Sequence, residues 1–149
     1  MNMCIDRSAV LIVLALVSGL VLAGEAFTTT AHGARYKDLR PGTGESVETG
    51  DVVTLHFVGW LDDNGNQGRE LYNTRRDGKP VSFVVGTDRV MPGWSDGIIG
   101  MRKGGKRLLM LPPGLAYGDK GVEGVIPPDA GLIFIIELLD LEKAQSGGT

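Results

Sequence analysis

The chain has 149 residues, a formal net charge of −3 at pH 7 and a single cysteine, and it is long enough for one modest hydrophobic core. The slight acidic excess gives it no general affinity for nucleic acid. Because the cysteine, Cys4, lies close to the N-terminus, the rest of the chain has no residue for a disulfide, a thiolate nucleophile or a cysteine metal site.

The N-terminal segment has the layout of a secretory signal. Arg7 precedes an uncharged apolar run over residues 8–24, and small residues close that run. Cleavage after Ala23 or after Ala26 would each fit, which makes residues 1–26 a signal peptide. The run is also at the short edge of what spans a bilayer, so an uncleaved membrane anchor is the alternative. We therefore expect a secreted or periplasmic protein or, alternatively, a membrane-anchored one that faces the periplasm.

The first half of the remaining chain is predicted to be mostly extended. Residues 27–35 look like a flexible, weakly structured lead-in. β-Branched and aromatic residues favour a strand over residues 52–60, and Asn64-Gly65 is a strong signal for a turn between extended runs. The elements expected after this turn are a short strand around Leu71 and Tyr72, a polar loop over residues 73–80 and a valine-rich strand over residues 81–86.

One short helix is predicted within the segment RVMPGWSDGIIGM, residues 89–101. Trp94, Ile98 and Met101 recur at positions i, i+4 and i+7, so they share one face of a helix. Pro92 fits an early helical position, where its missing N–H costs nothing.

Two more strands complete the predicted sheet. They are expected over residues 107–112 and 131–142, and the second is the most apolar segment after the N-terminal run. The pattern predicts an α+β fold in which an antiparallel sheet curls as a half-barrel around the one helix, since nothing else can cover its apolar face. The folded domain is expected over residues 36–143, followed by a disordered tail over residues 144–149.

One motif resembles a phosphate-binding loop but lacks its context. Gly100, Gly105 and Lys106 have the spacing of such a loop, yet Arg107 stands where Ser or Thr is required. The motif also follows a helix and precedes a strand, which is the reverse of the required order. We therefore predict a hairpin turn.

The polar residues build no recognisable catalytic or metal site. His32 is in the lead-in, and His56 is in the middle of a strand with no acidic residue two positions away. A structural role for His56 is the better interpretation. No nucleophile, histidine and acid can be assembled into a catalytic set, and we expect neither a metal nor a cofactor.

Aromatic side chains are the remaining candidates for a site. Trp94 heads the short helix between Gly93 and Gly97, whose small size would leave its ring approachable. An aromatic floor with the Tyr117 hydroxyl at its rim would form a small apolar pocket. Core packing is the alternative interpretation for each aromatic residue taken alone.

Five stretches of the sequence match one known family in order and nearly in spacing. They are VTLHFVGWL, GKPVSFVVG, VMPGWSDGIIGM, LPPGLAYG and GVIPPDAGLIFIIELL. From Tyr36 to Lys143 the chain resembles the FKBP-type peptidyl-prolyl cis–trans isomerases, the FK506-binding immunophilins. The resemblance implies a curled sheet on a short helix and an isomerase (rotamase) activity on X–Pro bonds during protein folding.

The resemblance also implies a set of site residues. The residues that it makes catalytic are Tyr117, Trp94, Phe57, Asn73 and Phe134, and those that it makes substrate-binding are Tyr72, Phe83, Val90, Met91, Val125 and Ile126. By the same resemblance Trp94 forms the floor, while the Tyr117 hydroxyl and the Met91 N–H hold substrate carbonyls. Val125 and Ile126 sit on a flap that Pro127-Pro128 stiffen.

Two positions depart from the family pattern. Asn73 stands where the family usually has an aspartate, and Val81 replaces a frequent aromatic residue. The first should weaken turnover, and the second should make the pocket wall shallower. The resemblance implies proline-containing polypeptides as partners and macrolides such as FK506 or rapamycin as inhibitors. We expect a monomer that does not bind nucleic acid. The alternative function is a proline-binding or chaperone-like module with little turnover.

Overall fold

The computed structural model describes residues 26–87 and 91–145. The predicted signal peptide or anchor therefore lies almost wholly outside the described residues, and so do Val90 and residues 146–149 of the predicted tail. None of the helices within the described ranges is long and apolar enough to cross a membrane. In chain order the elements are β1 (Thr28–Thr29), β2 (Arg35–Arg40), β3 (Thr43–Ser46), β4 (Val52–Asp63), β5 (Asn66–Asn73), α2 (Thr74–Asp77), β6 (Val81–Val84), α3 (Pro92–Ile98), β7 (Arg102–Lys103), β8 (Lys106–Leu111), a 3₁₀ turn η1 (Pro113–Leu115) and β9 (Leu132–Glu142).

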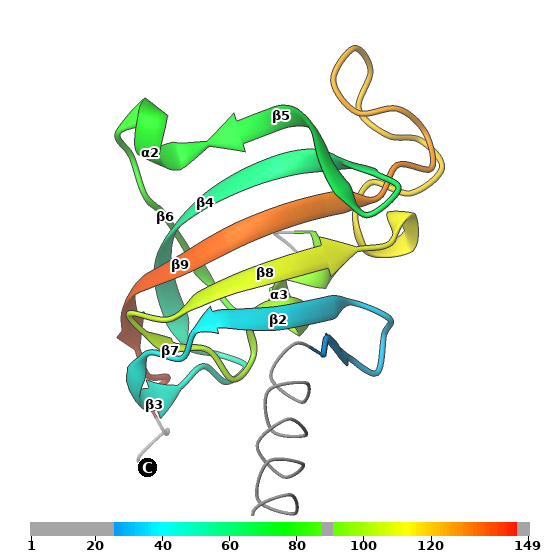
Figure 1. The fold of residues 1–149 in the computed structure, drawn as a ribbon. Helices are drawn as coiled ribbons and strands as arrows, with labels where there is room; N and C mark the ends of the chain where they lie inside the picture. Colours follow the sequence, from blue (N-terminus) through cyan, green and yellow to red (C-terminus); the bar gives the residue numbers. More distant parts are fainter. Residues whose placement is uncertain (1–25, 88–90, 146–149) are drawn as a thin grey trace, which may run out of the picture.

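The main sheet is antiparallel and has the strand order β1-β2-β8-β9-β4-β5 (Figure 1). The long strands β4 and β9 pair along most of their length, from Val52 with Glu142 to Leu61 with Leu132. The other edge of β4 is shared, because β6 pairs with its first part and β5 with its last part. This division lets the sheet curl.

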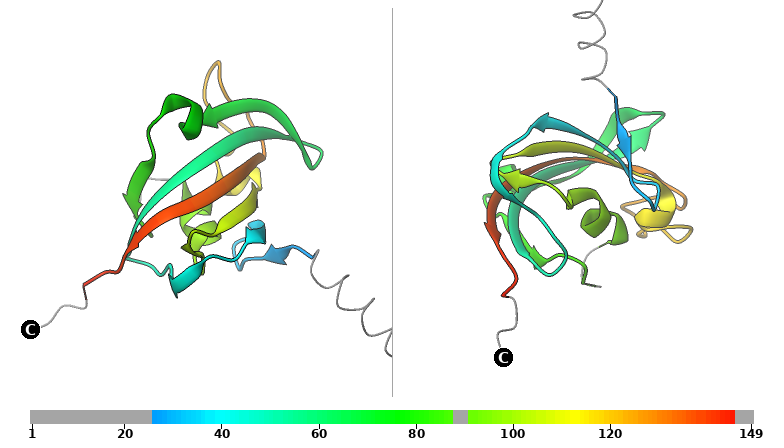
Figure 2. Two further views of the ribbon diagram at one scale, coloured as in Figure 1. Left: turned by 60° about the vertical axis from the view of Figure 1, so that its left-hand side comes forward. Right: turned by 90° about the horizontal axis from the view of Figure 1, so that it is seen from below.

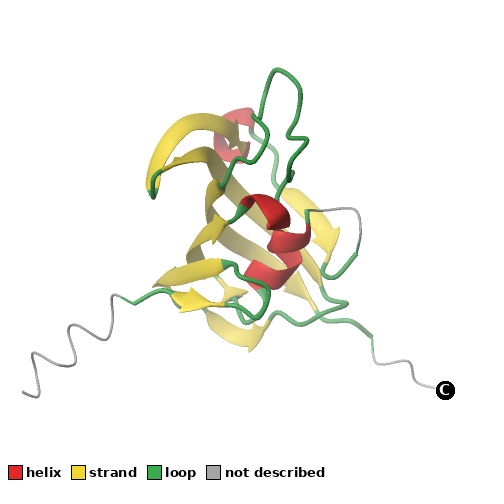
Figure 3. Ribbon diagram, turned by 90° about the vertical axis from the view of Figure 1, so that its right-hand side faces the viewer, coloured by secondary structure: helices red, strands yellow, loops and turns green. Residues whose placement is uncertain are grey.

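The sheet wraps around α3, as the sequence predicts (Figures 2 and 3). Trp94 and Ile98 of α3 are buried in one core cluster with side chains of the sheet such as Leu109 and Ile136. Met101 is buried there too, but α3 ends at Ile98, so Met101 follows the helix and is not on its face. Helix α3 begins with Pro92 at its first turn. The α+β prediction and the position of the one core helix are confirmed.

Two glycines let α3 lie close to β8. A Cβ atom at Gly93 would come within 2.5 Å of the Leu111 side chain, and one at Gly97 within 2.4 Å of the Leu109 side chain. These glycines thus contact the sheet, and Trp94 is only 5% exposed. The two glycines therefore serve the packing of α3 on β8, and only a small part of the Trp94 ring is open to solvent.

A buried threonine fills the gap between β5 and β6 on the edge of β4. The Thr74 hydroxyl oxygen accepts a hydrogen bond from the Phe57 N–H at 2.9 Å and lies 2.8 Å from His56 Nδ1. Thr74 is the first residue of α2, so the segment predicted as a polar loop contains one helical turn. The contact also gives His56 the structural role that the sequence indicates.

The predicted weakly structured lead-in contains regular structure. Thr28 pairs with Tyr36 between β1 and β2, and β2 pairs with β8. The Thr30 hydroxyl donates a hydrogen bond to the Asp96 carboxylate on α3, and His32 Nδ1 lies 3.0 Å from the other oxygen of Asp96. The lead-in prediction fails because β1 is only two residues long, and because β8 and Asp96 lie more than sixty positions away, where no local pattern shows them.

The segment RKGGKR is a turn but not a hairpin. Its first strand, β7, pairs with β3 through Thr43 and Lys103, whereas the following β8 belongs to the main sheet. The Gly105 N–H donates to the Arg102 carbonyl at 2.8 Å and closes the turn. The hairpin prediction is therefore wrong. The segment does follow helix α3 and precede strand β8, which is the reverse of the order that a phosphate-binding loop requires.

A buried carboxylate fastens the end of β9 to the start of β4. Asp51 accepts hydrogen bonds from the Glu48 N–H at 2.8 Å, the Ala144 N–H at 2.8 Å and the Lys143 ammonium at 2.7 Å. The hydrogen bond from Lys143 holds the pKa of Asp51 below its ordinary value. Because the folded pKa is the lower one, this stabilisation is present at neutral pH and is lost as the pH falls below about 4.

Replacing Asp51 with asparagine should lower the free energy of unfolding at pH 7 by about 2 kcal/mol, the range of a charged hydrogen bond. The difference from the native chain should shrink as the pH falls below about 4, because Asp51 is then protonated first in the unfolded chain and, at lower pH, in the folded chain as well. Urea unfolding at a series of pH values measures both quantities. Glu142→Gln, at an exposed carboxylate at the end of β9, is the control, and a difference independent of pH would contradict the assignment.

Candidate functional site

Five aromatic rings from β4, β5, β6, α3 and β9 meet on the inner face of the sheet. The Phe57 and Trp94 rings meet edge to face with centroids 4.5 Å apart, and Phe134 meets Trp94 in the same way at 5.4 Å. Phe83 lies 5.7 Å from Trp94, and Tyr72 lies 6.1 Å from Phe57. These separations are those of favourable aromatic pairs, and they bring together residues that are far apart in sequence.

The rings differ in their exposure. Phe57, Tyr72 and Phe83 are half-buried, whereas Trp94 is 5% exposed and Phe134 is fully buried. Phe134 therefore supports the cluster from behind. The backbone of β4 comes close to it at Gly59, where a Cβ atom would lie 2.7 Å from the Phe134 ring.

Tyr117 brings a second phenol to the cluster, beside that of Tyr72. It follows η1 and is half-buried against the core. Burial, followed by a side-chain hydrogen bond with Tyr72, raises the pKa of Tyr117 to about 12. The phenol is therefore neutral at physiological pH and keeps a proton that it can donate.

The flap, residues 117–128, is closed by its own backbone. Val122 and Ile126 exchange two hydrogen bonds, each 2.8 Å long. Their side chains take different places, because Val125 is 40% exposed while Ile126 is 3% exposed and belongs to the core. Of the two predicted flap residues, only Val125 presents its side chain to solvent.

Asn73 caps α2 with its side chain. Its Oδ1 accepts a hydrogen bond from the Arg76 N–H at 3.1 Å, and its backbone is extended as a cap requires. Met91 precedes α3 and is half-buried. Its backbone carbonyl accepts a hydrogen bond from the backbone N–H of Trp94 at 3.0 Å. Val90, the remaining predicted residue, lies outside the described part of the chain.

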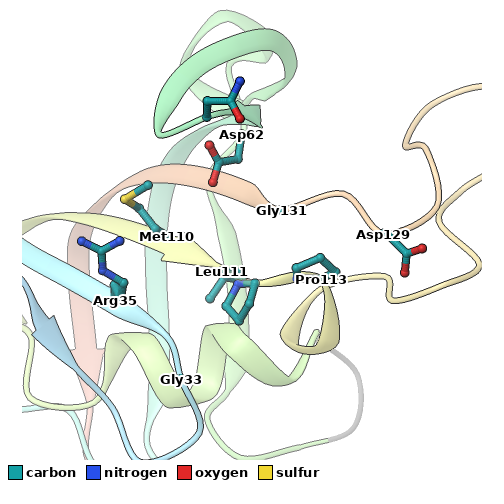
Figure 4. A pocket seen from close by; sticks show the side chains of 10 residues that line it. Gly33, Arg35, Asp62, Met110, Leu111, Pro113, Asp129 and Gly131 are labelled. Atoms are coloured by element: carbon teal, nitrogen blue, oxygen red, sulfur yellow. The ribbon is translucent and has the colours of Figure 1, made fainter.

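A hollow of about 360 Å³ opens away from this cluster, where β8 runs into Pro112 and Pro113 (Figure 4). Arg35, Asp62 and Asp129 give it polar walls. It contains none of the predicted site residues. Another hollow, of about 400 Å³, adjoins the flap between Arg69 and the Pro127-Pro128 pair.

The chemistry of the aromatic cluster is apolar. Within residues 26–87 and 91–145, no group of three or more His, Cys, Asp or Glu side chains is placed to hold a metal ion. The cluster offers ring faces and the phenol hydroxyls of Tyr72 and Tyr117. Such an arrangement can bind a small apolar ring beside an amide carbonyl.

Two residues that position this region were missed by the sequence interpretation. The Thr74 hydroxyl completes the edge of β4 beside Phe57, and the Arg69 guanidinium donates to the Val125 carbonyl on the flap. A threonine next to an expected strand end carries no distinctive signal. For Arg69 the sequence did contain a usable signal, the preceding Gly68, because a glycine within a strand often marks a bulge.

Comparisons with known proteins agree with this geometry. The family model described as FKBP-type peptidyl-prolyl cis-trans isomerase matches residues 43–139. FK506-binding protein 2 of Yarrowia lipolytica is 39% identical over 139 residues, which cover 92% of this chain and 94% of that protein. The FKBP-type peptidyl-prolyl cis-trans isomerase FkpA of Escherichia coli strain K12 is 41% identical over 116 residues, 78% of this chain but 40% of that protein.

A solved structure gives the same result for the fold. The crystal structure of AtFKBP13 superimposes with a TM-score of 0.68 at 34% identity, over 77% of this chain and 98% of that one. The family match and the relatives together span the sheet, α3 and the aromatic cluster. The chain belongs to the FKBP-type peptidyl-prolyl cis-trans isomerases, a family of isomerases.

Proposed function

We propose that this chain accelerates rotation about X–Pro bonds in folding polypeptides at the aromatic cluster. The observation that carries the proposal is the edge-to-face packing of Phe57 and Phe134 on Trp94, with the neutral Tyr117 hydroxyl nearby. Trp94 would form the floor under the proline ring, and Phe57, Tyr72 and Phe83 its walls. Phe134 would hold the floor in place from behind.

The reaction requires no nucleophile, metal or cofactor. Resonance holds the X–Pro amide planar, with a barrier to rotation of about 18–20 kcal/mol. The planar amide is more dipolar than the twisted one, so an apolar site disfavours the planar ground state relative to the twisted transition state. Catalysis then depends on binding the twisted geometry more tightly than the planar one.

Two groups would orient the substrate in this site. The Tyr117 hydroxyl would donate a hydrogen bond to a substrate carbonyl, and the Met91 N–H at the start of α3 would donate another. The exposed Val125 would contact the chain beside the proline at the rim. Val90 and Ile126 remain part of the proposed binding set, Ile126 through its packing beneath the flap.

A binding module with little turnover is the second candidate function. Asn73 favours it, because an amide stands at the position of the family's usual aspartate and its side chain is engaged in capping α2. A neutral hydrogen bond contributes about 0.5–1.5 kcal/mol, against about 1.5–3 kcal/mol for a charged one. The loss should weaken catalysis without abolishing it.

Location and partners follow the same proposal. Residues 8–24 support export by a signal peptide or retention by a membrane anchor, which would place the domain in the periplasm or outside the cell. We propose proline-containing polypeptides as its clients and a single-domain monomer as its working form. Relatives named as FK506-binding proteins support FK506-type macrolides as inhibitors.

The proposed function predicts that the full-length chain accelerates the slow, proline-limited phase in the refolding of a test protein. Asn73→Asp should raise this acceleration about fivefold, since about 1 kcal/mol is regained at tenfold per 1.36 kcal/mol. Its thermal stability should be unchanged, because aspartate caps a helix as well as asparagine. Stopped-flow fluorescence and thermal unfolding measure the two quantities.

Asn73→Ala serves as the matched control. It removes the cap as well as the polar group and should cost about 1 kcal/mol of stability. Peptide binding by the native chain, without acceleration in either the native protein or Asn73→Asp, would favour the binding module over the enzyme.

A further inference from the structure

A β-bulge in β5 redirects one arginine beside the site. The β4–β5 ladder pairs Trp60 with Glu70 and Asp62 with Gln67. Between these two pairs β4 has one residue, Leu61, whereas β5 has two, Gly68 and Arg69. A Cβ atom at Gly68 would come within 2.9 Å of the Leu61 carbonyl oxygen, so this position requires glycine. Bulges near active sites commonly turn a side chain in a new direction.

The redirected side chain is bonded to the flap. A guanidinium N–H of Arg69 donates to the carbonyl oxygen of Val125, and both residues line the hollow beside the flap. The β4–β5 hairpin and the flap indeed rise at the same end of the sheet (Figure 1). In the described part of the chain, this is the one hydrogen bond that joins residues 119–128 to a residue outside the flap.

Residues 119–128 therefore depend on two kinds of contact, the packing of Val122 and Ile126 against the core and this one hydrogen bond. Ile126 is buried in the core beneath the flap, which fixes the depth of the flap. The bond from Arg69 acts at the neighbouring carbonyl, on the exposed side of the flap, and fixes its direction. The exposed Val125 side chain keeps its position beside the hollow only while both kinds of contact persist.

We propose that Arg69 is a positioning residue that holds the flap in its substrate-binding place before a proline segment arrives. The proposal rests on the proposed function, because it assigns the flap to the rim of the same site. Arg69 acts through the Val125 backbone and has no part in the amide rotation itself. A flap that is already ordered saves the cost of ordering it on binding, so Arg69 should affect affinity more than turnover.

The test compares Arg69→Met and Arg69→Lys with the native full-length chain. Arg69→Met should weaken binding of an X–Pro peptide about fivefold, since tenfold corresponds to about 1.4 kcal/mol. The cis–trans exchange rate of the bound peptide should stay within about twofold of native. Arg69→Lys keeps a donor and should recover part of the affinity, and the amide NMR signals of residues 122–126 should shift most in Arg69→Met.

Lys120→Met is the matched control, because Lys120 lines the same hollow and carries the same charge. It should leave both the affinity and the flap signals at native values. Equal effects of Arg69→Met and Lys120→Met would overturn the proposal, and so would unchanged flap signals in Arg69→Met. A native chain that fails to accelerate exchange would refute the isomerase proposal alone, since the flap signals judge Arg69 without any turnover.

Discussion

Replacing Arg107 with methionine is expected to lower the free energy of unfolding by about 3–5 kcal/mol, the cost of breaking a buried charged network. Arg107 is 3% exposed and lies on β8 beneath the helix. Its guanidinium donates to the carbonyls of Gly97 and Ile99 at 2.8 and 2.9 Å, at the end of α3. It also donates to the Asp38 carboxylate at 2.7 Å.

The effect should be large because methionine leaves these helix-end carbonyls without a donor. Each buried polar group that loses its partner costs about 1–3 kcal/mol. The guanidinium also stacks over the Tyr36 ring at 4.0 Å, a contact that methionine replaces only in part. For a domain of this size the melting temperature should fall by roughly 10–20 °C.

Arg102→Met on β7 is the matched control for this experiment. Arg102 is exposed, so its replacement should change the free energy of unfolding by less than about 0.5 kcal/mol. Urea unfolding of both variants against the native chain gives the comparison. An Arg107→Met protein as stable as Arg102→Met would show that the network does not hold α3 on the sheet.

Replacing Trp94 with leucine is expected to reduce kcat/KM for an X–Pro peptide by about tenfold, which corresponds to about 1.36 kcal/mol of transition-state binding. Leucine removes the ring on which Phe57, Phe83 and Phe134 pack. Each aromatic pair contributes about 0.5–1.5 kcal/mol beyond the area that it buries. Trp94 Nε1 has no hydrogen-bond partner within the described ranges, so the effect should come from the ring alone.

Trp60→Leu controls for the loss of a tryptophan as such. Trp60 lies on β4, pairs with Ile133 of β9 and is not part of the aromatic cluster. Its replacement should leave kcat/KM within about twofold of native, with circular dichroism confirming that both variants are folded. Equal losses of kcat/KM in the two variants would contradict the proposal that Trp94 is the floor of the site.

The sequence predicted the parts of the fold that local patterns specify. The runs of apolar residues predicted the main strands, and the spacing of Trp94, Ile98 and Met101 predicted the helix. Each of these elements shows itself in the periodicity of its own hydrophobic residues. The short strands β1, β3 and β7 were missed. Strands β3 and β7 pair with each other across about sixty residues, as in the pairing of Thr43 with Lys103. All three strands have only two to four residues, too few to show a period.

The site residues likewise fall into those that the sequence indicated and those that it did not. The aromatic residues were named from a family resemblance, and the structure brings Phe57, Tyr72, Phe83, Trp94 and Phe134 together. Arg69 and Thr74 were missed because each acts through one hydrogen bond to a backbone segment that only the folded sheet brings near. Arg107 was noticed only as a mismatch in a motif, whereas its burial depends on how α3 lies over β8.

The most direct test of the whole account is two-dimensional exchange NMR on a short X–Pro peptide in the presence of a small fraction of the native chain. The uncatalysed peptide interconverts over tens to hundreds of seconds, so cross-peaks between cis and trans signals within a second report catalysis. We expect such cross-peaks with the native chain and much weaker ones with Trp94→Leu. A native chain that shifts the peptide signals without producing cross-peaks would contradict the proposed activity.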